Sequence, residues 1–350
     1  MKTLTIGDRR VGTGRAPYVI AEIGSNHNGD MDLCMRLIDE AASCGVDAVK
    51  FQSWSSTSLV SRGEYARNTT YSDTKKHFGT LEQMVDAYQF TPEMHHRAAA
   101  HCRAKGVTFM STPFSPEEVD LLEELGVSAY KVASMDINHP VLLEAIARTG
   151  KPVILSTGMA TLGEVEKAIS ILKQSGATSI ALLHCVSIYP PDPDDVNLLN
   201  MPTLERAFGL PVGFSDHTMG VAVPLAAVAL GACIIEKHFT IDKGMEGWDH
   251  AISADVQEMK SLVNDGRLVQ RALGSYERTV SAAETQKRAK FRRRIVIRHA
   301  VPAGHVLSLA DIDYKRPGNG IDPDLHRQVV GRTVLRDLED DHELEWSDLG

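Results

Sequence analysis

The sequence PVGFSDHTMGVAVPLAAVALGACIIEKHFT, residues 211–240, contains the pattern that decides the fold. An apolar run over 211–217 ends in polar residues, a helix-length stretch of small apolar residues follows, and a second run over 233–239 also ends polar. This order predicts a parallel strand–helix–strand unit, in which both strands end at the same edge of the sheet. We therefore expect His217 and His238 to emerge together, within reach of one metal ion or one small ligand.

The same alternation recurs along most of the chain. Strand-like runs occur at 18–24, 47–53, 107–113, 129–134, 153–158, 180–185, 211–217 and 233–239. Helical patterns lie between them, and several end at a glycine, a common helix cap, directly before the next strand. Eight such repeats in about 250 residues predict an α/β fold of the TIM (β/α)8 barrel type rather than an open sheet. Residues 4–12 predict a β-hairpin before the barrel, and the polar stretch 54–85 predicts a rim or lid loop.

The character of the sequence changes near residue 275. We expect a barrel domain with its hairpin over 1–275, a polar and basic linker over 276–290, and a small β-rich domain over 291–350. The last of these contains short strands separated by turn signals at PAG and PGNG. In a chain with a formal net charge of −9, the basic stretch indicates a solvated connector rather than a nucleic-acid site.

The composition argues against several other classes of protein. The acidic net charge of −9 disfavours nucleic acid and anionic membranes as partners. No apolar run approaches the roughly 20 residues that a membrane-spanning helix needs, and the N-terminus lacks the apolar core of a signal peptide. Five cysteines without CxxC spacing predict free thiols rather than disulfides or a zinc ribbon. We therefore expect a cytoplasmic globular protein.

Polar side chains end nearly every predicted strand, which is where the catalytic groups of a TIM barrel lie. They include Glu22, Lys50, Gln52, Thr112, Lys131, Ser134, Ser156, His184, Ser215, His217, Glu236, Lys237 and His238. Lysines among short hydroxyl donors suit a phosphate or a carboxylate. Two histidines suit Mn, Fe, Co or Zn with positions left for water or substrate; a hydrogen-bonded structural pair is the alternative. Glu22 and Asp249 are placed to transfer protons or to bind hydroxyl groups.

At these positions the sequence resembles the sialic acid synthase family, including the legionaminate, pseudaminate and spore-coat polysaccharide synthases. The motifs are AEIGSNHNG (21–29), VKFQ (49–52), STPFS (111–115), YKVAS (130–134), LSTGM (155–159), GFSDHT (213–218), EKHFT (236–240) and KRPGNG (315–320). The resemblance implies a TIM barrel, an antifreeze-like (SAF) domain, and a homodimer in which the SAF domain caps the partner's barrel. The implied reaction condenses phosphoenolpyruvate with an N-acylated aminosugar, such as N-acetylmannosamine, and water. Its products are a nine-carbon 2-keto-3-deoxy acid and phosphate, for surface polysaccharide biosynthesis.

The resemblance also implies roles for individual residues. His217 and His238 match the metal ligands, with Mn the usual ion and Mg or Co as alternatives. The phosphoenolpyruvate side is matched by Lys50, Thr112, Lys131, Ser134, Ser156 and Ser215, and the sugar side by Glu22, Gln52, Tyr189 and Asp249. Arg316 matches the arginine that the SAF domain sends into the neighbouring subunit's site. Ser187 replaces an asparagine of the family pattern, Asp136 a glutamate, and Trp248 a proline beside Asp249.

Three alternatives stay open at the level of sequence. A Schiff-base aldolase would use a strand-end lysine such as Lys131 as an imine-forming group. A synthase of the kind that makes octulosonate phosphates would take a phosphorylated sugar. A non-catalytic sugar-binding protein built on the SAF domain is the third, and the full set of polar strand ends argues against it.

Overall fold

The computed structural model describes residues 2–72, 77–316 and 318–350. The chain divides into two compact units, Met1–Gly274 and Ser275–Gly350. The first unit contains an eight-stranded sheet in the order β7-β4-β3-β12-β11-β10-β9-β8. Its strands are β3 (Tyr18–Gly24), β4 (Ala48–Ser53), β7 (Thr108–Pro113), β8 (Tyr130–Val132), β9 (Val153–Ser156), β10 (Ile180–Cys185), β11 (Val212–Asp216) and β12 (Ile234–His238). Every pair in the ladder is parallel, and the end strands β7 and β8 contact each other, so the sheet nearly closes into the predicted barrel.

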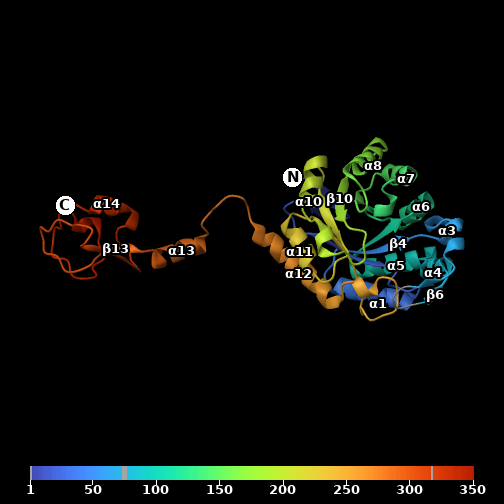
Figure 1. The fold of residues 1–350 in the computed structure, drawn as a ribbon, viewed down its shortest axis with the longest axis horizontal. Coiled ribbons are helices and arrows are strands. Elements are labelled where there is room, and N and C mark those ends of the chain that lie inside the picture. Colours follow the sequence, from blue (N-terminus) through green and yellow to red (C-terminus); the bar gives the residue numbers. More distant parts are fainter. Residues whose placement is uncertain (1, 73–76, 317) are drawn as a thin grey trace. The chain divides into compact units, whose positions relative to one another are not determined.

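Helices alternate with the strands and cover the outside of the barrel (Figure 1). They are α1 (Met31–Ser43), α5 (Pro92–Lys105), α6 (Pro116–Leu125), α7 (Pro140–Arg148), α8 (Leu162–Gln174), α10 (Asn200–Phe208), α11 (Ala222–Ala229) and α12 (Val256–Leu273), with the short α9 (Pro193–Val196) before α10. Local sequence sets their ends: Thr161 and Glu164 form a capping box at the start of α8. Gly106 ends α5 at φ 72°, a left-handed conformation that glycine adopts without strain.

The N-terminal hairpin fills one end of the barrel. β1 (Thr3–Ile6) and β2 (Arg9–Gly12) pair antiparallel, as the sequence predicts. Leu4, Ile6 and Val11 belong to the same buried cluster as the side chains inside the barrel. Those interior side chains include Ile20, Ala48, Met110, Ala129, Ile154, Leu183 and Ile234. The hairpin therefore closes the amino-terminal end of the barrel with apolar side chains.

The stretch after β4 is a folded insert rather than the polar loop that the sequence predicted. It contains α2 (Ser56–Leu59), α3 (Arg62–Arg67), β5 (Tyr71–Ser72), β6 (His77–Gly79) and α4 (Leu81–Tyr88). Its apolar side chains form a separate cluster, with Met84 and Tyr88 packed against Trp54 and Phe114. Trp248, from the loop after β12, packs against this cluster as well. The insert therefore has its own small core at the rim of the barrel.

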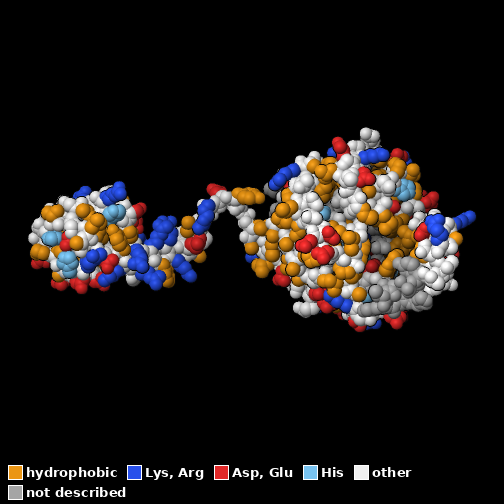
Figure 2. Space-filling view, viewed as in Figure 1, with side chains coloured by type: hydrophobic (Ala, Val, Ile, Leu, Met, Phe, Trp, Pro, Cys, Tyr) orange, Lys and Arg blue, Asp and Glu red, His pale blue; other side chains and the backbone are white. Residues whose placement is uncertain are grey.

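The first helix of the second unit is α13 (Ala282–Phe291), which lies within the segment 276–290 that the sequence predicts as a linker except for its last residue. Lysine and arginine side chains gather along this helix (Figure 2). Beyond it, β13 (Arg294–Ile297) and β14 (Ile312–Lys315) pair antiparallel, and isolated bridges join further extended segments. The remaining elements are α14 (His326–Val329) and the 3-10 turns η3 (Pro323–Leu325) and η4 (Trp346–Asp348). A small apolar core, which includes Ile295, Leu307 and Leu344, holds this β-rich unit together.

Among the helices of the described residues, none combines the length and the apolar character needed to cross a membrane.

Candidate active site

A buried polar layer lies directly above the apolar interior of the barrel. Its members are Glu22, Lys50, Thr112, Lys131, Ser156, Cys185, Ser215 and Glu236. Each stands two residues beyond an interior position of its strand, and strand side chains alternate, so both layers face inward. On β11 the lower position is Gly213, where an added Cβ would lie 2.4 Å from the Ile234 carbonyl oxygen. Each strand therefore contributes one side chain to the polar layer, towards its carboxyl end.

Two lysines and two glutamates alternate within this layer. Lys50 Nζ lies 2.6 Å from Glu22 Oε2 and donates to Thr112 Oγ1 at 3.0 Å. Lys131 Nζ donates to Ser156 Oγ at 2.6 Å and lies 3.6 Å from Glu236 Oε1. Glu236 also lies 3.8 Å from Lys50 Nζ, between the two ammonium groups. The sequence marked Glu236 only as one polar strand end among many, although its two-residue spacing from His238 places both on the same face.

The two carboxyl groups have different protonation behaviour. Burial raises the pKa of Glu22 to about 7, against the opposing charge of Lys50. Burial also acts to raise the pKa of Glu236, but Lys131 and Lys50 outweigh it and bring that pKa below its ordinary value. Neighbouring carboxyls with pKa values pushed apart are typical of sites that need one proton carrier and one fixed charge. Glu22 can exchange a proton near neutral pH, whereas Glu236 stays ionised.

These groups line a cavity of about 310 Å³ at the barrel mouth. The predicted site residues that line it are Glu22, Lys50, Gln52, Thr112, Lys131, Ser134, Ser156, Ser187, Tyr189, Ser215, His217 and His238. Gln52 Nε2 donates to Glu22 Oε1 at 2.8 Å, and Ser134 Oγ accepts from the Gly158 N–H at 3.0 Å. The sequence did not predict the apolar part of the wall, which comes from Phe114, Ala133, Met135 and Met159. The cavity thus has a charged floor and a partly apolar upper wall.

Three predicted residues do not line this cavity. Asp249 Oδ2 lies just outside it, 3.7 Å from His238 Nδ1, and accepts a hydrogen bond from Ser25 Oγ at 3.4 Å. Asp136 lies in the 3-10 turn η1 (Ser134–Asp136), and burial raises its pKa to about 7. Arg316 belongs to the second unit, where its guanidinium lies 5.7 Å from the centre of the Phe291 ring.

The two predicted metal ligands face each other across the ends of β11 and β12. The centres of the His217 and His238 rings are 5.5 Å apart, and the Tyr189 ring lies 4.0 Å from the His217 ring. His217 Nδ1 lies 2.8 Å from the Val186 carbonyl oxygen, which can only accept, so Nδ1 carries the proton and donates. This bond orients the ring and leaves Nε2 available as a ligand, the usual arrangement of metal-binding histidines.

The protonation of the two imidazoles differs. Burial, followed by the charges of His217 and Lys50, lowers the pKa of His238 well below its ordinary value, so this ring is neutral. Burial favours neutral His217 too, but the Cys185 thiol and the Val186 carbonyl outweigh it and raise its pKa. Metal binding at His217 would therefore release a proton.

The donor set fits a divalent ion only as part of a coordination shell. Two imidazoles with the Asp249 carboxylate nearby suit a borderline ion such as Mn, Co or Zn. Within residues 2–72, 77–316 and 318–350, no group of three or more histidine, cysteine or acidic side chains is arranged to hold a metal by itself. Substrate and water oxygens would have to complete the shell, as in catalytic rather than structural sites.

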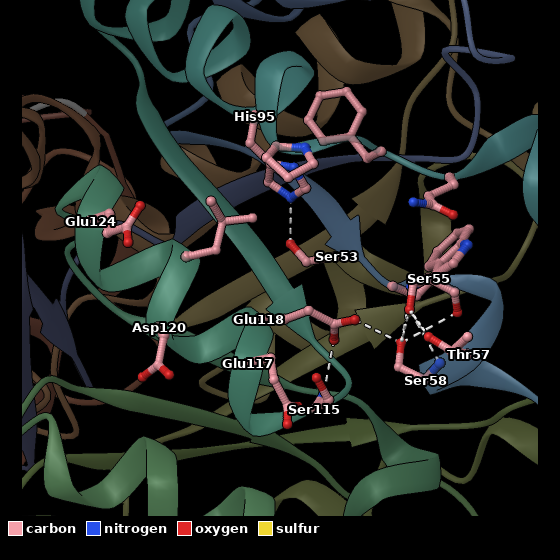
Figure 3. Close-up of a pocket in the computed structure, with 15 residues that line it drawn as sticks. Ser53, Ser55, Thr57, Ser58, His95, Ser115, Glu117, Glu118, Asp120 and Glu124 are labelled. Atoms are coloured by element: carbon pink, nitrogen blue, oxygen red, sulfur yellow. Dashed lines mark hydrogen bonds between the residues drawn. The ribbon is translucent and has the colours of Figure 1, made fainter.

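A larger hollow of about 740 Å³ is lined by the end of β4, by α2, by the start of α5 and by α6 (Figure 3). Its wall includes Ser53, which contacts His95 at 2.6 Å, and Glu118, which accepts from Ser58 at 2.6 Å. Further carboxylates line it, and none of its lining residues is a lysine or an arginine. An anionic ligand would be repelled there, so the smaller cavity with Lys50 and Lys131 is the candidate active site.

Comparison with known proteins agrees with this architecture. Residues 37–278 match the NeuB family and residues 292–350 match the SAF domain. The chain is 42% identical over its whole length to an uncharacterized protein of Methanocaldococcus jannaschii, covering 99% of it. It is 40% identical to the N,N'-diacetyllegionaminic acid synthase of Campylobacter jejuni, over 92% of this chain and 97% of that one. The N-acetylneuraminic acid synthetase of Leptospira borgpetersenii, solved with citrate, superposes with a TM-score of 0.74 at 36% identity, over 82% of this chain and 95% of that chain.

These matches confirm the resemblance found in the sequence, since they cover both units and the relatives nearly end to end. The class is a TIM-barrel protein with a C-terminal SAF domain. The chain belongs to the NeuB family.

Proposed function

We propose that this protein condenses phosphoenolpyruvate with an open-chain N-acylated aminosugar and water, giving a nine-carbon 2-keto-3-deoxy acid and phosphate. One observation carries the proposal: the buried lysine–hydroxyl layer and the histidine pair open into the same cavity. The first set suits an anion with two charged ends, and the second suits an ion that binds a carbonyl oxygen. The relatives named as synthases of N,N'-diacetyllegionaminic acid and of N-acetylneuraminic acid support the same reaction class.

The lysine–hydroxyl layer would bind phosphoenolpyruvate. Lys50 and Lys131 are both at least 96% buried in their side chains, where charge-assisted hydrogen bonds are stronger than in water. Their present partners, Thr112 and Ser156, are hydroxyl groups that can also donate to phosphate or carboxylate oxygens. Ser215 now donates to Glu236 at 3.0 Å, which fixes that carboxylate beside the lysines.

The histidine pair would hold a divalent ion, with Mn expected. When bound, such an ion supplies a Lewis acid for the aldehyde oxygen of the sugar. The polar groups on the acceptor side, Glu22 and Gln52 within the cavity and Asp249 beside it, would orient the sugar hydroxyls. The apolar wall from Phe114 and Met159 would contact the acyl or deoxy parts of the acceptor.

The reaction balances without a further reactant. Carbon C3 of phosphoenolpyruvate bonds to the aldehyde carbon, water adds to C2, and the C2–O bond to phosphate breaks. One proton of the water ends on the new hydroxyl group and the other on phosphate. Glu22 is suited to carry the first of these protons, because its carboxyl exchanges near pH 7.

A homodimer is part of the proposal. Exposed apolar side chains surround the mouth on the loops after β8 to β11, namely Met135, Met159, Ile188, Tyr189 and Met219. Such a patch on a monomer commonly marks a protein interface. The SAF domain of the partner would cover it and bring Arg316 to the cavity. The cysteines, all buried and unpaired, fit a cytoplasmic location.

The test is phosphate release from phosphoenolpyruvate with a panel of acceptors in the presence of Mn²⁺. N-acetylmannosamine, a diacetamido-trideoxyhexose and a phosphorylated hexosamine separate the acceptor classes. With ¹⁸O in the bridging position, C–O cleavage leaves the label in the released phosphate. Release of phosphate with no acceptor, or trapping of Lys131 by borohydride and pyruvate, would instead support a different reaction.

A further inference from the structure

A buried ion pair links the two strands that end in His217 and His238. β11 and β12 pair in register, Ser215 opposite Glu236 and then Asp216 opposite Lys237. The first of these pairs faces into the barrel. Because successive strand residues alternate in direction, Asp216 and Lys237 face the surrounding helices instead. The histidines follow directly after this ion pair on both strands.

Asp216 and Lys237 form hydrogen bonds with each other and with Thr218, the residue that follows His217. Lys237 Nζ donates to Asp216 Oδ2 at 2.6 Å and to the Thr218 carbonyl oxygen at 2.6 Å. Asp216 Oδ1 accepts from the Thr218 N–H at 2.9 Å and from Thr218 Oγ1 at 2.8 Å. His217 is thus fixed on both sides, through Asp216 and Thr218, to the residue that precedes His238.

This ion pair is buried in the otherwise apolar layer between the sheet and the helices. The side chains of Lys237 and Asp216 are 1% and 0% exposed. Their neighbours on the same face, Phe214 and Ile235, belong to the apolar layer between sheet and helices. Replacement of a buried ion pair by apolar side chains of similar volume is often neutral or stabilising. Stability alone therefore does not explain the charges, whereas their directional hydrogen bonds do constrain the backbone.

We propose that Asp216 and Lys237 are positioning residues: their ion pair fixes the Asp216–Thr218 turn against the end of β12 and so sets the separation of the two imidazoles. The consequence for metal binding rests on the proposed function, whereas the constraint on the turn does not. An apolar pair at these positions would preserve the fold and loosen the turn.

The test uses the full chain with the double substitution D216L/K237M, which removes both charges and leaves neither partner unpaired. D39N/K105M is the matched control, since the Lys105–Asp39 ion pair at 2.9 Å is half-exposed and lies on α1 and α5. Because buried Thr218 loses its hydrogen-bond partners, we expect the double variant to fold but to melt below the wild-type temperature, and to bind Mn²⁺ at least tenfold more weakly by electron paramagnetic resonance. The separation of the His217 and His238 ring centres, 5.5 Å in the wild type, should change in a crystal structure of the variant. The control should match the wild type in all three measurements.

Unchanged Mn²⁺ affinity and an unchanged separation of the two imidazole rings in a folded D216L/K237M variant would overturn the proposal. If the wild type itself bound no Mn²⁺, the metal part of the proposed function and its link to this ion pair would fall. The separation of the two ring centres would then decide the positioning role by itself: a changed separation in the variant supports it, and an unchanged separation overturns it.

Discussion

Two neighbouring layers inside the barrel come from the same strands, two residues apart, and have opposite chemistry. The lower layer, which includes Ile154 and Met110, is apolar and continuous with the N-terminal hairpin. The upper layer holds four charged side chains, each at most 6% exposed. Burying apolar surface stabilises the fold, while burying charges opposes it unless they are paired. The difference indicates that the lower layer supplies stability and that the upper layer uses part of it for chemistry.

The largest effect should come from removing a charge from the upper layer. We expect K131M to lower kcat/KM for phosphoenolpyruvate by about 10³-fold, because a buried donor to the anion is lost and Glu236 keeps only one ammonium neighbour. Steady-state phosphate release measures this. A loss below tenfold would mean that the upper layer does not bind the reacting anion.

Loss of the metal site should follow. We expect EDTA treatment, or H217A, to reduce activity by about 10²-fold or more, since the polarising ion is lost. Mn²⁺ should restore the EDTA-treated wild type and not H217A. Full activity of the metal-free protein would mean that the reaction needs the lysines of the upper layer but no metal ion.

The lower layer should respond in the opposite way. We expect I154A to lower the free energy of unfolding by about 2–4 kcal/mol, through lost burial and the cavity left behind. The kcat of the folded variant should stay within about threefold of the wild type, because Ile154 faces the apolar cluster rather than the cavity. Urea unfolding measures the change in stability, and an activity assay at low temperature, where the variant stays folded, measures kcat. A large fall in kcat with little loss of stability would contradict the division between the layers.

A pH profile gives the smallest and sharpest test of the upper layer. Glu22 has a folded-state pKa of about 7, above its ordinary 4.5, so its carboxylate forms only as the pH rises through 7. We expect kcat/KM of the wild type to rise about tenfold per unit below pH 7 and to level off above it, and E22Q to lose this limb.

The same shift has a consequence for stability, with a defined sign. Between about pH 4.5 and 7 folded Glu22 holds a proton that the unfolded chain has released, so rising pH destabilises the fold over this window. E22Q should lose less stability than the wild type between these two pH values, as measured by urea unfolding. An identical loss in both proteins would place the titration on another group.

The sequence predicted the barrel well because its signals are local. Alternating strands and glycine caps such as Gly106 need no knowledge of tertiary contacts, and the polar strand ends follow from the same alternation. It did not separate Glu236 from Lys237, although the two-residue spacing of Glu236 from His238 places Glu236 on the cavity side and Lys237 on the side of the helices. It also missed the folded insert after β4, whose core depends on Phe114 and Trp248 from distant parts of the chain. The sequence also marked His184 rather than its neighbour Cys185 as the polar end of β10. In the structure Cys185 lines the cavity, whereas His184 lies outside it, with its ring Nε2 2.6 Å from the Val196 carbonyl oxygen.

The hairpin at the amino-terminal end of the barrel has a kinetic consequence. Since the side chains of β1 and β2 fill the amino-terminal end of the barrel, ligands would reach the cavity from its carboxyl-terminal end. The lysines lie on the floor, among side chains at most 4% exposed, and the histidines and Tyr189 lie nearer the mouth. If phosphoenolpyruvate binds on this floor and the sugar above it, as proposed, the anion would have to bind first, because a sugar bound nearer the mouth would block its path.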